Sequence, residues 1–174
     1  QGPHGALPQY CIVPISIGAH IILALQEIIA REFDPHDACV ITVGTFHAGT
    51  AMNIIPEEAE LTGTLRADTK EAQQKLTKRV KEVAEATAKV YGADTEVEID
   101  AGGPPLICDP STTKEFVGYM RELKLPETME YPNISASASE DFAFVAEQVP
   151  STFMYLSSGY MDERGAYSAH NPKV

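Results

Sequence analysis

The sequence lacks tryptophan and is poor in positive charge and in cysteine. Only 13 Lys and Arg stand against 25 Asp and Glu, so the formal net charge is −12. This balance argues against nucleic-acid binding, which needs basic side chains to neutralise phosphates. The three cysteines are widely spaced and form no C-x-x-C pattern, so they predict neither a disulfide framework nor a zinc site. They suit a reducing compartment, and we expect a cytoplasmic protein.

Long apolar runs and targeting signals are also missing. No run reaches the roughly 18 consecutive apolar residues that a membrane span needs, and no signal peptide is visible. We therefore expect no membrane partner. The 174 residues are 44% hydrophobic, which is ordinary for one globular domain or one and a half. The chain opens on Gln-Gly-Pro-His and stops at Asn-Pro-Lys-Val without a closing element, so we expect it to be part of a larger protein.

The clearest pattern is a period of two over residues 59–68, which predicts a strand with one buried and one polar face. Around it the sequence predicts a helix from Pro14 to about residue 32, a strand over 39–47, a helix over 70–91 and a strand over 95–100. With one more strand before residue 1, this order is a split βαββαβ sandwich, in which helices cover one face of an antiparallel sheet. The predicted fold class is α+β.

Residues 102–105, Gly-Gly-Pro-Pro, mark a domain boundary. Beyond it we expect a helix over 112–123, a short strand over 127–131, a helix over 139–148 with Ser139 as N-cap, and a buried strand over 152–156. The domains predicted are therefore residues 1–102 and residues 103–174. Helices alternating with short apolar strands indicate part of an α/β domain.

Five residues could carry chemistry, although spacing alone assigns none of them. His4 lies in a Gly/Pro loop, Asn53 precedes a proline turn and Arg66 is on a polar strand face. Glu140 opens a predicted helix, where a carboxylate is favoured by the helix dipole, and His170 follows a polar loop. Each has an ordinary structural reading as a solvated, capping or turn residue. From the residues alone, the chain is an α/β piece without an assigned role.

The order of four motifs adds a resemblance. Gly2-Pro3-His4-Gly5-Ala6-Leu7-Pro8 comes first, then Asn53-Ile54-Ile55-Pro56 with Gly63-Thr64-Leu65-Arg66, then Ser139-Glu140-Asp141-Phe142, then His170-Asn171-Pro172. Together they resemble the dinuclear-metal amidohydrolase and peptidase family of aminoacylase, hippurate hydrolase and the indole-acetyl-amino-acid hydrolases. The resemblance implies that residues 1–102 are an inserted dimerisation (lid) domain. Residues 103–174 would be the C-terminal portion of the metal-binding catalytic domain, whose N-terminal part is absent.

The resemblance also implies roles for single residues. His170 would be a metal ligand, and His4 would reach across a homodimer to stabilise an oxyanion. Asn53 and Arg66 would both contact the substrate carboxylate, for which an arginine fork is well suited, and we add Glu140 as a substrate-binding residue. Where the family has Asp, this chain has Val13, so we expect the helix at Pro14 to begin without a side-chain cap.

The implied reaction is hydrolysis of an N-acyl-amino acid or a small peptide by a metal-activated water. Two divalent ions (Mn, Zn, Ni or Co) are expected in the parent protein, and whether this chain binds any stays open. The upstream ligands and the catalytic base are not matched here, so we expect the chain alone to be inactive. The alternative is a non-catalytic dimerisation or small-ligand-binding module on the same sandwich.

Overall fold

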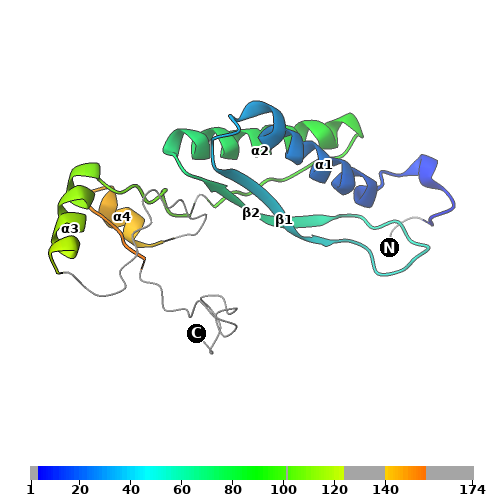
Figure 1. The fold of residues 1–174 in the computed structure, drawn as a ribbon. Coiled ribbons are helices and arrows are strands. Elements are labelled where there is room, and N and C mark those ends of the chain that lie inside the picture. The colour runs from blue at the N-terminus through cyan, green and yellow to red at the C-terminus, as the bar shows by residue number, and fades with distance from the viewer. Residues whose placement is uncertain (1–3, 101, 124–139, 156–174) are drawn as a thin grey trace, which may run out of the picture.

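The computed structural model describes residues 4–100, 102–123 and 140–155 (Figure 1). It is a mixed helix and strand structure, as the predicted α+β class requires. The elements in chain order are the 3-10 turn η1 (Pro8–Tyr10), α1 (Pro14–Glu32), β1 (Cys39–His47), β2 (Glu60–Ala67), α2 (Lys70–Val90), α3 (Pro110–Glu122) and α4 (Phe142–Ala146).

The strands β1 and β2 form an antiparallel hairpin whose two faces differ. Cys39 pairs with Ala67 at one end and His47 with Glu60 at the other, and a bulge interrupts the register between Val43 and Thr45. Before the bulge, Cys39 and Ile41 are buried, while Val40 and Thr42 are exposed. One face therefore belongs to the core, and the other, which we call the open face, does not.

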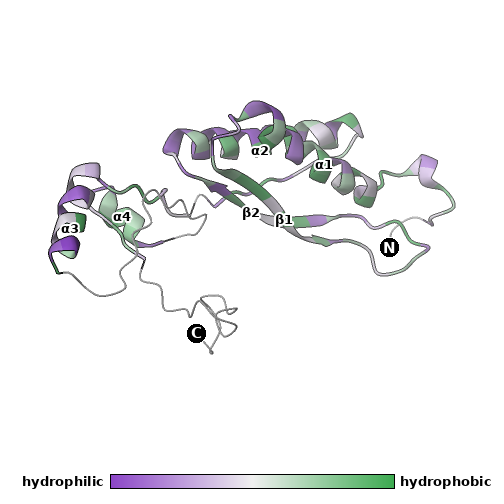
Figure 2. Cartoon of the chain, in the orientation of Figure 1, coloured by the Kyte–Doolittle hydropathy of each residue, from purple (hydrophilic) through white to green (hydrophobic). Residues whose placement is uncertain are grey.

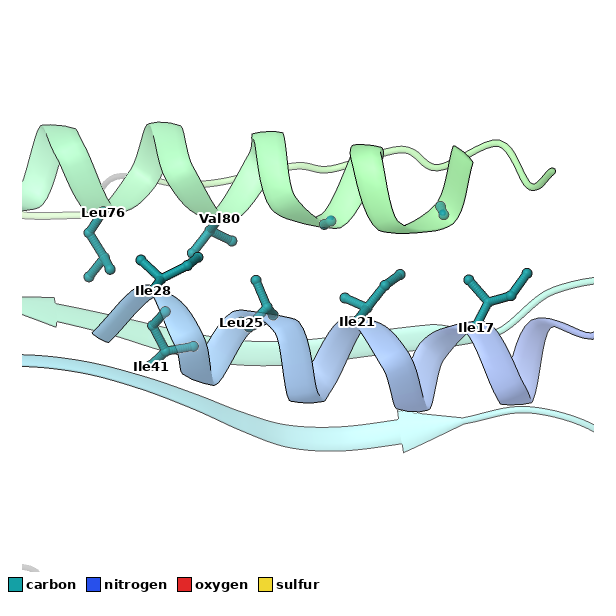
Figure 3. Close-up of a cluster of buried hydrophobic side chains, with 9 residues drawn as sticks. Ile17, Ile21, Leu25, Ile28, Ile41, Leu76 and Val80 are labelled. Carbon is teal, nitrogen blue, oxygen red and sulfur yellow. The ribbon is translucent and has the colours of Figure 1, made fainter. Parts of the chain in front are cut away.

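Helices α1 and α2 lie together on the core face of this hairpin (Figure 1). Their facing residues recur at helical spacing and form one cluster with Ile41 (Figure 3). Ile28 of α1 and Leu76 of α2 are each only 1% exposed and lie at its centre. The buried members are Ile17, Ile21, Leu25, Ile28, Ile41, Leu76, Val80, Ala84 and Ala88. Burial of these side chains is what holds the two helices on the hairpin.

The helix ends follow the local sequence. Thr69 caps α2 by accepting a hydrogen bond from the Ala72 amide at 3.1 Å. Gly92, just past the end of α2, has a φ of 77°, a conformation that glycine adopts without strain. Val13 precedes α1 with no side-chain cap hydrogen bond, as predicted.

The C-terminal end of α1 is clamped to α2 by charge. The Arg79 guanidinium donates from Nε and Nη2 to the two carboxylate oxygens of Glu32, at 2.7 and 2.8 Å. This bidentate pair lowers the pKa of the Glu32 carboxyl, and Lys75 adds to the attraction. Lys75 also donates to the backbone oxygen of Glu32 and lies 4.3 Å from the centre of the Phe33 ring.

Helix α1 is long and apolar enough, by length and composition alone, to cross a membrane. The sequence prediction overlooked this, because single polar residues interrupt its apolar runs. The core helix of a soluble protein passes the same test of length and composition. In the structure one side of α1 faces α2 in the core (Figure 3). Figure 2 shows α2 as the more hydrophilic of the two helices, with purple residues along its length.

Several predictions for the remaining segments need correction. Residues 95–100 form no strand, although Thr95, Val97 and Ile99 are half-buried and alternate with exposed residues. The side-chain period is present, but in the described part of the chain no strand neighbours this segment to complete a ladder. Of the strand predicted over 152–156, residues 152–155 are described and form no strand, and the helix predicted over 139–148 is shorter, Phe142–Ala146. Ser139 and the strand predicted over 127–131 lie outside the described residues.

The predicted helix over 112–123 is present as α3 (Figure 1). Asp109 caps α3 by accepting from the Thr112 amide at 2.8 Å, and this bond lowers the pKa of the Asp109 carboxyl. The segment before α3 is tied to the one after α4: the Asp109 amide donates to the Ser151 carbonyl at 2.7 Å. These contacts make residues 105–123 and 140–155 a second group of elements.

Candidate functional site

Backbone hydrogen bonding brings His4 and Asn53 together at the loop end of the hairpin. His4 forms an isolated antiparallel bridge with Ile54, and the Gly5 amide donates to the Asn53 carbonyl at 2.8 Å. The approach is close, because a side-chain carbon on Gly5 would lie 3.3 Å from the Asn53 oxygen. Ile55 is buried and anchors the loop. We call His4 and Asn53 the tip; both residues are exposed there.

A local bond sets the proton position on His4. Its Nδ1 accepts a hydrogen bond from the Ala6 amide at 3.2 Å. A neutral imidazole that accepts at Nδ1 carries its proton on Nε2, which is then a donor. The loop therefore presents an N–H donor at the exposed end of the ring. This is the chemistry that stabilisation of an oxyanion requires.

Arg66 lies on the open face of the hairpin, far from the tip. It is half-buried and stands opposite Val40, near the end of β2 that leads into α2. Glu60, at the other end, is six residues away, which corresponds to about 20 Å along a strand. Because the tip lies beyond the Glu60 end, one copy of the chain cannot direct Arg66 and His4 at the two ends of one small substrate.

Between these ends the open face carries hydroxyl groups. Thr42 stands opposite Thr64, and the hydroxyl oxygens of Thr45 and Thr62 are 2.5 Å apart, so they hydrogen-bond to each other. Apart from Val40 opposite Arg66, the open face is therefore polar at these positions, as the sequence alternation predicts.

The position of His47 is what the sequence alternation could not give. Counted from Cys39 with an unbroken period of two, His47 would share the buried face. The bulge between Val43 and Thr45 reverses this, so that His47 stands opposite Glu60 on the open face and is exposed. His47 and Glu60 thus lie at the strand ends that carry the tip. The sequence pattern did not single out His47 as a site residue.

Glu140 has a local structural partner. Its Oε1 accepts from the Phe142 amide at 3.3 Å and its carbonyl accepts from the Ala143 amide at 3.0 Å. The side chain therefore caps the start of α4, which is the ordinary reading of a carboxylate at a helix start. Its substrate-binding role stays a prediction. The predicted metal ligand His170 lies outside the described residues.

The described residues do not fit a two-metal centre. Among them no three His, Cys, Asp or Glu side chains converge as a metal-ligand set. Cys39 is buried, and burial raises the pKa of its thiol, which disfavours the thiolate that binds metals. The described part of the chain therefore offers hydrogen-bond donors and a guanidinium, but it does not by itself assemble a metal site.

Comparison with known proteins places these features in a family. The family model described as "Peptidase dimerisation domain", M20_dimer, matches residues 2–92. This range contains the tip, the hairpin and both helices of the core. Its match covers more than half of the chain.

Two curated relatives are similar along the chain. The N-acetyldiaminopimelate deacetylase of Enterococcus faecalis is 33% identical over 99% of this chain and 44% of its own length. The IAA-amino acid hydrolase ILR1-like 2 of Arabidopsis thaliana is 36% identical over 99% of this chain and 39% of its own length. The chain thus spans less than half of the curated relatives it matches.

Solved structures agree in fold. A candidate aminohydrolase from methicillin resistant Staphylococcus aureus superposes with a TM-score of 0.84 at 28% identity, covering 99% of this chain and 44% of that one. The Bacillus subtilis YXEP protein, described as a dinuclear metal binding peptidase from the M20 family, has a TM-score of 0.66 at 28% identity. That match covers 82% of this chain and 36% of the YXEP chain.

Proposed function

Because the chain belongs to the M20 family of peptidase dimerisation domains, we propose that it forms the dimerisation part of a metal-dependent amidohydrolase. The reaction is hydrolysis of the amide bond of an N-acyl-amino acid or a small peptide, of the hippurate hydrolase or aminoacylase type. The observation that carries this proposal is the tip, where the Ala6 amide holds His4 in the tautomer that donates from Nε2. The names of the similar deacetylase and amino acid hydrolase support the substrate class.

The residues of the chain have separate tasks in this reaction. The Nε2–H of His4 stabilises the oxyanion that forms on the attacked carbonyl, with Asn53 beside it. Arg66 binds the substrate carboxylate with its guanidinium, whose planar fork matches two carboxylate oxygens. Glu140 contributes to substrate binding from the second group of elements. His170 would be one ligand of two divalent ions in the whole protein, and those ions would supply a water of lowered pKa.

The tip lies beyond the Glu60 end of β2, which is itself about 20 Å from Arg66, and this separation supports a homodimer. Each active site takes Arg66 from one protomer, and His4 and Asn53 from the other. A neighbouring copy has a surface to use, because β1 pairs only with β2 in the described part of the chain and its other edge is open. Helix α1 also carries exposed apolar side chains, Ile15 and the 67% exposed Leu23.

The test is made on the full-length protein that contains this chain. Hydrolysis of a panel of N-acetyl- and N-benzoyl-amino acids is measured with Mn, Zn, Ni or Co, together with metal content. We expect amino-acid release and about two divalent ions per chain, with metal and activity both lowered by His170→Ala. A full-length protein with neither metal nor amidase activity would leave the non-catalytic dimerisation or binding module as the function, and a monomer in light scattering would contradict the homodimer.

A further inference from the structure

Two side chains of the first turn of α2 make contacts here: Lys70 with Glu147, which belongs to the second group of elements, and Gln73 with Gly103, in the segment that leads into that group. The Lys70 ammonium pairs with the Glu147 carboxylate, and the Gln73 amide nitrogen donates to the Gly103 carbonyl at 3.2 Å. Residues 70 and 73 are three apart in a helix and therefore lie on one side of it. Gly103 also lies close to α4, because a side-chain carbon added to Gly103 would lie 3.4 Å from the Phe144 ring.

Both charges of this ion pair stand at the less favourable end of their own helix. Lys70 is the first residue of α2, where the helix dipole disfavours a cation. Glu147 directly follows the last residue of α4, where the unpaired carbonyl groups disfavour an anion. Neither helix by itself favours the charge that it carries at this end. Across the contact, the charges of Lys70 and Glu147 attract each other, and this attraction offsets the unfavourable interaction of each charge with its own helix end.

We propose that Lys70 and Gln73, on one side of the first turn of α2, form a salt-sensitive contact that we call the latch. The latch docks the second group of elements onto the hairpin and its two helices. The lysine side chain is 52% exposed and the glutamate side chain 27% exposed. An ion pair this accessible to solvent is weak and is screened by salt. The latch therefore holds the two groups in one orientation at low ionic strength and releases them as salt is raised. This inference does not depend on the proposed activity.

Zero-length carbodiimide crosslinking of the 174-residue chain tests the latch, since it joins a lysine to a carboxylate only when they are in contact. At low salt we expect a Lys70–Glu147 crosslink by mass spectrometry within the monomer fraction. At 1 M NaCl, where the Debye length is about 3 Å, we expect its yield to fall at least about threefold. The Lys78–Glu82 pair, 3.8 Å apart within α2, is the internal reference.

Small-angle scattering of matched variants gives a second measurement. Lys70→Glu and Glu147→Lys should each enlarge the radius of gyration at low salt, and the double exchange should restore it together with its salt dependence. Lys78→Glu makes the same charge change elsewhere on α2 and should leave the radius unchanged. Recovery of the Lys78–Glu82 crosslink without the Lys70–Glu147 crosslink would overturn the proposal. A radius of gyration indifferent to Lys70→Glu would also overturn it.

Discussion

A single methyl group at Gly18 should disturb the contact between α1 and β1. Gly18 is buried on α1, and a side-chain carbon there would lie 2.6 Å from Cζ and 3.0 Å from Cε2 of the Phe46 ring. Alanine in place of glycine raises helix propensity by about 1 kcal/mol. Overpacking of this kind costs about 1–3 kcal/mol. We therefore expect Gly18→Ala to lower the free energy of unfolding by about 0–2 kcal/mol instead of raising it.

The assay is urea unfolding followed by far-ultraviolet circular dichroism, because the chain has no tryptophan. In a Phe46→Ala background the clash is removed, so the same Gly18→Ala change should stabilise by about 1 kcal/mol, which gives a coupling of about 1–3 kcal/mol. Gly118 of α3 has no atom within 4 Å of the added carbon, and Gly118→Ala should be stabilising too. If Gly18→Ala stabilises equally with and without the Phe46 ring, the packing described for these two residues is wrong.

Three further predictions concern charge and reactivity. The hydrogen bond from Arg79 lowers the pKa of the Glu32 carboxyl, so the pair stabilises the fold at neutral pH. This stabilisation is lost as pH falls through the lowered pKa. In a plot of the free energy of unfolding against pH, Glu32→Gln should therefore reduce the fall on the acid side. Because burial raises the pKa of the Cys39 thiol, alkylation at pH 8 should modify Cys39 more slowly than Cys11. Mass spectrometry of the native chain measures the two rates. Equal rates would contradict the described burial of Cys39. If the full-length protein has the proposed activity, Arg66→Ala should weaken the use of acidic substrates much more than metal content, and equal loss of both would indicate a structural role.

The hairpin and its two helices were predictable from the sequence because these elements are local and amphipathic. Helices α1 and α2 begin and end where Pro14, Thr69 and Gly92 indicate, and β1 and β2 pair as the alternation of residues 59–68 suggests. Residues 95–100 show the limit of such patterns. Alternation sets which side chains are buried, whereas a strand also needs a neighbour for its backbone bonds, and sequence period does not report one.

The tip was predictable in part. Resemblance picked out His4 and Asn53, and the structure brings them together through the Gly5 amide. No spacing rule indicates the bond from the Ala6 amide to His4, since it depends on the path of a Gly/Pro loop. The exposure of His47 also could not be derived, because it depends on a bulge that adds one residue to β1.

Intersubunit complementation tests the central claim most directly. Full-length His4→Ala and Arg66→Ala proteins are each prepared, and their subunits are exchanged. If one active site takes His4 and Arg66 from different protomers, each mixed dimer has one intact site, and N-acyl-amino acid hydrolysis should recover to about a quarter of the unmodified rate. If both residues serve the site from the same protomer, no intact site forms. A mixture as inactive as its two components would then contradict the account.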